Sequence, residues 1–140
     1  MTTPTTASNP AHVRASRADA TVAAEALNVD VLIVGAGISG VGSAYHLLTQ
    51  RPGTSFVILE RQETFGGTWW THKFPGIRSD SDLHTFGYRF KPWVGPPIAT
   101  AGEIRSYMQE NLADDSRDDQ RRDGQEVLGW VWSREAKCWS

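Results

Sequence analysis

The sequence predicts an α/β fold in which one helix connects two parallel strands. Three observations lead to this prediction: a short apolar run over 30–34, a cluster of glycines over 35–40, and a second apolar run over 56–59. Apolar runs without alternation are typical of strands that are buried on both faces, and such strands occur in parallel sheets. Parallel strands need a crossover connection between them, and we expect residues 41–50 to supply it as a helix.

The connecting helix is recognised by its period. Val41, Ala44, Tyr45 and Leu48 stand at i, i+3, i+4 and i+7, which places them on one face of a helix. Arg51-Pro52-Gly53 ends the helix, because proline cannot continue it and glycine suits the turn that follows. The two strands and the helix therefore form one βαβ unit with a right-handed crossover.

The chain beyond the second strand is less regular. Glycine, proline and tryptophan alternate with polar residues over 61–97, and a loop of that length in a compact domain is usually functional. A helix is expected over 101–112, because its apolar residues again share one face: Ile104, Tyr107, Met108 and Leu112.

The last part of the chain consists of a highly charged segment followed by a more apolar one. Residues 114–126 contain six acidic residues and three arginines without a large aliphatic residue, which favours a solvated connection. A strand is expected over Val127–Trp132, with Trp139 as a hairpin partner. We expect residues 28–140 to form one incomplete domain after a disordered tail over 1–27, and the strands that flank the predicted pair to follow residue 140.

Composition excludes several classes of protein. The chain has 140 residues, 39% of them hydrophobic and 21% charged, which is ordinary for one globular domain. The net charge of −2 gives no indication of a nucleic-acid surface, and no apolar run is long enough for a membrane span. One cysteine, Cys138, and the lack of an apolar signal segment indicate the cytoplasm.

Three glycines at the end of the first strand predict a phosphate-binding loop. Gly35, Gly37 and Gly40 form a G-x-G-x-x-G motif between a strand and a helix. The first glycine permits the tight turn, the second lets the backbone approach a pyrophosphate, and the third allows close packing of helix and strand. The helix N-terminus then holds the phosphate charge, and Ser39 adds a hydroxyl. The alternative is a well-made turn without a ligand.

An acidic residue in the expected place strengthens the case for a dinucleotide. Glu60 ends the second strand, 20 residues after Gly40. A carboxylate there accepts the hydroxyl groups of an adenosine ribose and repels a 2′-phosphate. The half-site therefore favours FAD or NAD over NADP, and the unit is predicted to be a Rossmann-like dinucleotide-binding domain.

Further motifs carry a resemblance to a known family. They are the Gly66-Gly67-Thr68-Trp69 turn, the segments 74–82 (FPGIRSDSD) and 88–93 (YRFKPW), and the glycine loop with Glu60. In combination they resemble class B flavoprotein monooxygenases, most of all Baeyer–Villiger monooxygenases of the ethionamide-activating and long-chain-alkane type. The resemblance extends from about Asp30 to Tyr107.

The resemblance implies roles for individual residues. Ser39 and Glu60 would contact the diphosphate and ribose of FAD, and Val127 would contact the adenine. The path towards the flavin ring would be lined by Thr68, Trp69 and Trp70. Phe86 would contact the flavin, and Gly67 would also belong to the cofactor site. Arg78, Ser79 and Asp80 would lie where the flavin and NADP sites meet. Asp80 is the candidate catalytic residue, because it resembles the aspartate that orients the catalytic arginine of the family.

Ordinary structural interpretations remain open for some of these residues. Adjacent tryptophans often serve packing alone, and Asp80 and Asp82 are also suited to capping turns. His72 and His84 lack partners at metal-ligand spacing, and Trp93, Trp130 and Trp132 are assigned to core or hairpin faces.

The sequence also departs from the family pattern. No second G-x-G-x-x-G motif follows Gly42, and the catalytic arginine of the family has no counterpart here. The resemblance therefore implies the amino-terminal FAD-binding portion of an NADPH-dependent monooxygenase that acts on a ketone, sulfide or amine. A non-catalytic nucleotide-binding remnant is the alternative, and a disulfide reductase is disfavoured because no C-x₄-C pair occurs. We expect the isolated chain to be marginally stable.

Overall fold

The computed structural model describes residues 27–113 and 117–140, and the expected tail lies outside them except for Leu27. A three-stranded parallel sheet has the order β1-β2-β3. Its strands are β1 (Val31–Val34), β2 (Phe56–Leu59) and β3 (Arg121–Arg122). Helix α1 (Ile38–Gln50) connects the first two strands, as the sequence predicts, and each strand boundary agrees within one residue.

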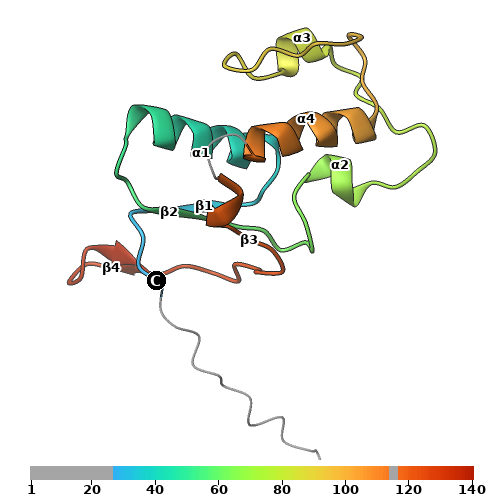
Figure 1. Ribbon diagram of the computed structural model, residues 1–140. Coiled ribbons are helices and arrows are strands. Elements are labelled where there is room, and N and C mark those ends of the chain that lie inside the picture. Colours follow the sequence, from blue (N-terminus) through green and yellow to red (C-terminus); the bar gives the residue numbers. More distant parts are fainter. Residues whose placement is uncertain (1–26, 114–116) are drawn as a thin grey trace, which may run out of the picture.

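Two helices cover one face of the sheet (Figure 1). Helix α4 (Ala101–Ala113) lies beside α1, and its four predicted apolar residues are all buried. Together with the sheet they form one core whose members include Ile33, Phe56, Ile58, Val41, Ala44, Ile104, Met108 and Leu112. The opposite face is more open, since Leu32 and Val34 of β1 are exposed. Within the described residues no helix is long and apolar enough to cross a membrane.

The third strand corrects the expectation for residues 114–126. The part of that segment that the structure describes forms a 3₁₀ helix, η1 (Arg117–Gln120), and then β3. Strand β3 pairs with β2 in parallel, with Ile58 opposite Arg121. The expectation of a connection without regular structure was therefore wrong, although most of its described residues are exposed, as expected. The expectation that every flanking strand follows residue 140 was also wrong. Backbone hydrogen bonds beside Glu60 hold this short strand, not an apolar side-chain pattern.

The carboxy-terminal strand was also placed incorrectly. Residues 127–131 are not in a strand, and the hairpin consists of β4 (Trp132–Ser133) and β5 (Cys138–Trp139). The predicted hairpin partner is confirmed, because Trp132 pairs with Trp139 across the two strands. Trp93 packs against the core, whereas Trp130 is 60% exposed and belongs to neither a core nor a strand.

The long segment over 61–97 contains two helices of one turn each. Helix α2 (Thr68–Thr71) packs on α4, and α3 (Leu83–Phe86) is capped by Asp82, whose side chain accepts a hydrogen bond from the His84 N–H. The predicted capping role of Asp82 is therefore confirmed. The buried Tyr107 holds residues 88–91 of this segment against α4. Its hydroxyl accepts a hydrogen bond from the Tyr88 N–H at 2.8 Å and donates one to the Lys91 carbonyl oxygen. Burial raises the pKa of Tyr107.

Candidate dinucleotide-binding site

The glycine loop brings α1 close to the end of β1. Gly35 has a φ of +95°, which L side chains rarely adopt, so the tight turn needs glycine there. Gly40 is buried, and a Cβ atom at this position would lie 2.0 Å from the Gly35 carbonyl oxygen. The first and third glycines of the motif therefore have the structural roles that the sequence predicts.

The N-terminus of α1 offers backbone donors to a ligand. Val41 makes the first intrahelical bond, from its N–H to the Gly37 oxygen at 3.1 Å. The N–H groups of the three residues before Val41 have no acceptor within the helix. No side chain caps this end, and no acidic residue lies in the first turn. A phosphate group would therefore find free donors and the positive end of the helix dipole.

Glu60 is buried beside this loop and is only 5% exposed. One carboxylate oxygen, Oε2, accepts the Ala36 N–H at 2.7 Å, and Oε1 accepts the Gln62 N–H at 2.8 Å. An ionised carboxylate has about four acceptor positions, so roughly two remain for a ligand. Glu60 thus holds the glycine loop in place and can still accept hydroxyl groups.

A second glycine turn docks against the first. Gly66 and Gly67 have φ angles of +128° and +52°, and the Gly66 N–H donates to the Ala36 oxygen at 3.0 Å. A Cβ atom on Gly67 would lie 3.1 Å from the Gly37 Cα, and one on Gly37 would lie 3.8 Å from the Gly67 Cα. The two turns therefore meet backbone to backbone. A side chain on Gly67 would be crowded there, whereas a Cβ atom on Gly37 would make an ordinary van der Waals contact.

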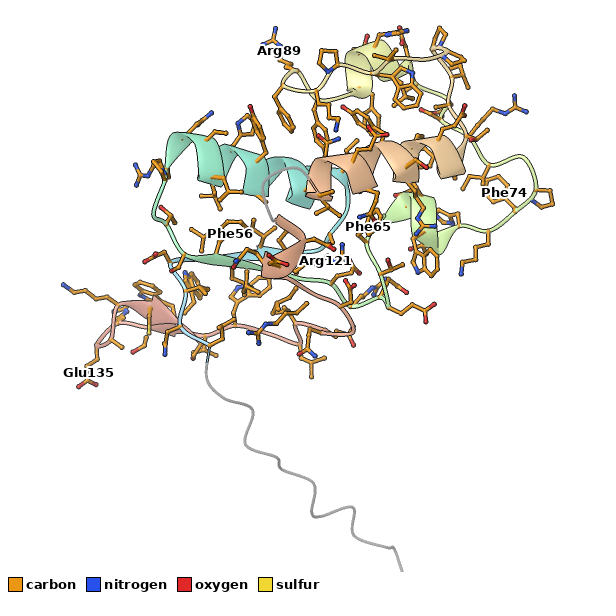
Figure 2. The ribbon with its side chains drawn as sticks, in the orientation of Figure 1. Phe56, Phe65, Phe74, Arg89, Arg121 and Glu135 are labelled. Carbon is orange, nitrogen blue, oxygen red and sulfur yellow. The ribbon has the colours of Figure 1, made fainter. Side chains whose placement is uncertain are left out.

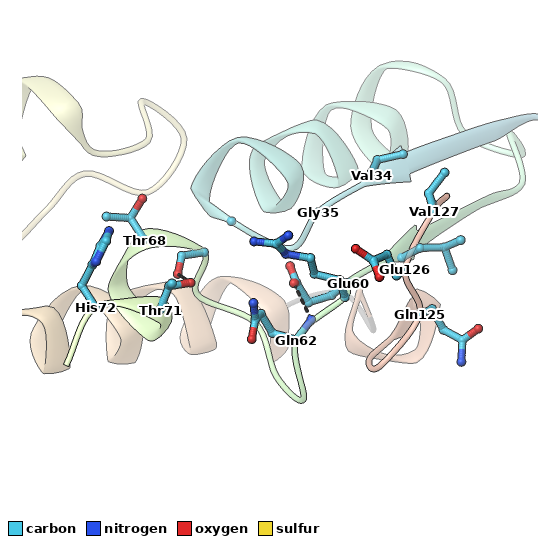
Figure 3. A pocket seen from close by; sticks show the side chains of 14 residues that line it. Val34, Gly35, Glu60, Gln62, Thr68, Thr71, His72, Gln125, Glu126 and Val127 are labelled. Carbon is cyan, nitrogen blue, oxygen red and sulfur yellow. Dashed lines mark hydrogen bonds between the residues drawn. The ribbon is translucent and has the colours of Figure 1, made fainter. Parts of the chain in front are cut away.

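Two adjoining hollows lie at this contact between the glycine turns. We name each after one residue that lines it: the Glu60 hollow has a volume of about 530 Å³, and the Phe86 hollow one of about 330 Å³. Both are lined by Val34, Gly35, Gly37, Gly67 and Thr68. Figure 3 shows the Glu60 hollow, with Thr68 and His72 on one side of Glu60 and Gln125 and Val127 on the other. The arrangement suits an elongated ligand that crosses the glycine turns.

The structure brings most of the candidate residues to these hollows. Ten of them line one or both: Gly35, Gly37, Ser39, Gly40, Glu60, Gly67, Thr68, Trp69, Phe86 and Val127. Ser39, Trp69 and Phe86 line the Phe86 hollow, and Val127 lines the Glu60 hollow on the opposite side of the contact.

Four candidates do not line either hollow: Trp70, Arg78, Ser79 and Asp80. Ser79 is buried and its hydroxyl donates to the Ser81 carbonyl oxygen at 2.7 Å. Asp80 is exposed, and its carboxylate accepts a bond from the Ser81 hydroxyl at 3.3 Å. Arg78 is exposed and forms a backbone bridge with Thr100.

Sequence reasoning missed several residues that line the Glu60 hollow: Arg61, Gln62, Thr71, His72, Gln125 and Glu126. Their position follows from β3, because the Gln125 N–H donates to the Glu60 carbonyl oxygen at 2.8 Å and holds this segment beside β2. The carboxyl ends of parallel strands gather ligand-binding residues, so a prediction of β3 would have indicated them.

The comparisons with known proteins agree with this geometry. Residues 33–94 match the family model of an NAD(P)-binding Rossmann-like domain. The chain is 46% identical over 112 residues to a probable FAD-binding monooxygenase, AlmA, from an Acinetobacter species. It is 47% identical over 112 residues to the FAD-containing monooxygenase EthA of Mycolicibacterium smegmatis. Each alignment covers 79% of this chain but only 22% and 23% of the relatives, so the chain spans less than a quarter of their length.

Solved structures show the same fold. A steroid monooxygenase bound to NADP matches with a TM-score of 0.72 and 26% identity, over 79% of this chain and 22% of that one. A cyclohexanone monooxygenase matches with a TM-score of 0.71 at 23% identity, over 79% of this chain and 23% of that one, which supports the fold alone.

Proposed function

The chain is related to FAD-containing monooxygenases, whose amino-terminal portion it matches, and we propose that it forms the FAD-binding portion of such an enzyme. The observation that carries the proposal is the backbone contact between Gly37 and Gly67, which joins the Glu60 hollow to the Phe86 hollow. FAD is an elongated dinucleotide that needs a diphosphate site in its middle and a separate place at each end.

The residues present fit FAD. The free N–H groups at the start of α1 suit its diphosphate, and the absence of Cβ atoms at the meeting of the glycine turns lets the backbone approach it. Glu60 keeps acceptor positions for the ribose hydroxyl groups. When bound, FAD supplies the oxidation–reduction chemistry that no side chain of the protein can perform.

We assign roles to the candidate residues on this basis. Ser39 lies at the diphosphate, and Val127 lines the adenine end. Thr68, Trp69 and Phe86 line the path to the flavin ring, where aromatic side chains help to exclude water.

Residues 78–80 have a different proposed role. Arg78 and Ser79 would lie where the NADP site adjoins the flavin, and Asp80 would hold a catalytic arginine that a longer chain supplies. The exposure of Asp80 supports this role, since its carboxylate is free to accept further donors. Trp70 is assigned to the flavin path through its neighbour Trp69.

The proposal extends to the reductant and the substrate of the whole protein. We infer that NADPH is the reductant and that the substrate is a ketone, a sulfide or an amine that receives one oxygen atom from O₂. We also infer a cytoplasmic protein, in keeping with its single, unpaired Cys138. The domain would extend over residues 28–140.

A pair of glycine variants tests FAD binding. Gly37→Val places a branched side chain beside Gly67, in the space that we assign to the diphosphate, so we expect the affinity for FAD to fall by at least about tenfold, or 1.4 kcal/mol. Gly129→Val is the matched control, because no atom lies within 4 Å of a Cβ at Gly129. Quenching of flavin fluorescence measures the FAD affinity of both variants. Equal FAD binding by Gly37→Val, or a wild-type chain that binds NAD but not FAD, would contradict the proposal.

A further inference from the structure

Aromatic residues and cations alternate beside the second glycine turn. Phe65 precedes the turn and Trp70 closely follows it, and the Arg105 guanidinium carbon lies 5.5 Å from the Phe65 ring and 4.5 Å from the Trp70 ring. Two further cations lie near these rings: Lys73 Nζ at 4.0 Å from the centre of the Trp70 ring, and the Arg121 guanidinium carbon at 5.0 Å from the centre of the Phe65 ring. We call these five residues the cation–aromatic stack. Contacts of this kind are attractive, because a ring face carries partial negative charge.

Arg105 differs from the other arginine of the stack in its partners. Arg121 forms ion pairs with Asp118 at 2.6 Å and Asp123 at 2.9 Å. Arg105 makes no ion pair with any residue in 27–113 or 117–140, and its buried Nε has no hydrogen-bond partner there. For a half-buried cation with no anion among the described residues, the two rings beside it are the attractive contacts that the structure shows. The position of Arg105 is therefore tied to the positions of Phe65 and Trp70.

The stack connects the core of the domain to the glycine turn. Arg105 follows Ile104, which is fully buried in α4, so the base of its side chain is fixed. Phe65 is itself 5% exposed and lies beneath α4 next to Arg121 (Figure 2). A Cβ atom on Gly66 would lie 3.3 Å from the Arg105 Nε and 3.0 Å from the Trp70 Cβ. Arg105 thus packs directly against the turn whose next residue, Gly67, meets Gly37.

We propose that Arg105 is a positioning residue, which holds Phe65 and Trp70 on either side of the Gly66-Gly67 turn and so keeps that turn against the phosphate-binding loop. The inference rests on the proposed function, because the turn matters for the dinucleotide that crosses it. Arg105 lines neither hollow, and it therefore acts through the turn and not through a contact with the ligand.

The test removes the cation and keeps the bulk of the side chain. Arg105→Met retains an apolar stem of similar length but loses the cationic attraction to both rings, so the affinity for FAD should fall by up to about tenfold. Arg134→Met is the matched control. This substitution removes the same charge, but Arg134 is exposed in the hairpin and lies outside the stack. The loss in Arg105→Met should be unchanged at high salt, whereas direct attraction of the FAD diphosphate would be screened.

Hydrogen exchange provides a second readout that needs no ligand. The Gly66 N–H bonds to Ala36 at 3.0 Å, and Arg105→Met should speed its exchange by about tenfold. The amide of Ile58, in the middle of β2, should exchange as in the wild type. A Trp70→Leu variant should reproduce the effect, and the double variant should lose less than the sum of the two single changes.

The outcomes separate the two proposals. Failure of the wild-type chain to bind FAD would overturn the proposed function, and exchange at Gly66 would then decide the role of Arg105 alone. Unchanged Gly66 exchange in Arg105→Met, or equally faster exchange at Gly66 and Ile58, would overturn the positioning role. A loss of FAD affinity that disappears at high salt would overturn it as well, since Arg105 would then act on the ligand by its charge.

Discussion

Replacement of Gly40 by alanine tests the close packing of α1 on the glycine loop. The added Cβ atom would lie 2.0 Å from the Gly35 carbonyl oxygen and 3.1 Å from its carbon. Both atoms belong to the backbone, so no side-chain rotation can relieve the overlap. Real Cβ atoms essentially never approach another heavy atom closer than 3.0 Å, so the helix or the loop must shift by about 1 Å.

The expected cost is the difference between two opposing effects. Overpacking of a tight site costs about 1–3 kcal/mol, and a rigid backbone partner favours the upper end of that range. Alanine in place of glycine inside a helix stabilises by about 1 kcal/mol. The net loss for Gly40→Ala is therefore about 2 kcal/mol, which lowers the melting temperature of a domain of this size by roughly 5–10 °C.

The matched control is a second helix glycine in open surroundings. Gly102 is exposed in the first turn of α4, and a Cβ atom there would meet only the Thr100 Oγ1 at 4.0 Å. Gly102→Ala should leave stability unchanged or raise it by up to about 1 kcal/mol. Urea unfolding of both variants measures the difference. A Gly40→Ala variant as stable as Gly102→Ala would refute the close packing.

Two carboxylate variants give further predictions. Glu60→Gln should lower the unfolding free energy by about 1–3 kcal/mol in urea, because its amide nitrogen would face the N–H of Ala36 or Gln62; unchanged stability would contradict this. The Thr100 N–H and then the Thr100 hydroxyl lower the pKa of Glu103 below its ordinary 4.5. Its stabilising effect is therefore present above pH 4.5 and lost as the pH falls through the lowered pKa. The stability gap between wild type and Glu103→Gln should close on acidification, and a gap independent of pH in unfolding experiments would argue against it.

Much of the fold could be predicted because its signals are local. The first strand, the glycine loop and α1 follow one another without a break, and each carries its own pattern. Helix α4 was predicted from its apolar face, and its start carries a further local signal. Thr100 and Glu103 form a capping box, in which the Glu103 N–H donates to the Thr100 hydroxyl and the Glu103 carboxylate accepts the Thr100 N–H.

Strand β3 could not be predicted, because its stability comes from partners far away in the sequence. Arg121 and Arg122 form neither an apolar run nor an alternation. The Glu60 N–H donates to the Arg122 oxygen at 2.9 Å, and the Arg121 side chain lies on the Phe65 ring. The pairing therefore depends on residues of β2 and of the loop after it, and not on a sequence pattern in β3.

The parts of the site that have local sequence signals could also be predicted, and the parts formed by distant residues could not. The glycine motif and Glu60 identify the loop by spacing alone, and the structure brings both to one place. The contact between Gly37 and Gly67 joins turns 30 residues apart, which no local pattern reveals. For the same reason no local pattern showed that Gln125 shares a hollow with Glu60, and Val127 was expected at this site only from the family resemblance.

The central claim is that FAD crosses the contact between the two glycine turns. Titration of the isotope-labelled chain with FAD, followed by the backbone amide signals in NMR, tests it most directly. We predict that the amides of 37–40, 66–69 and 125–127 shift together and saturate at one FAD for each chain. The account would be contradicted if these signals stayed in place, or if FAD shifted only the separate groove that Trp93 and Tyr107 line on the other side of α4.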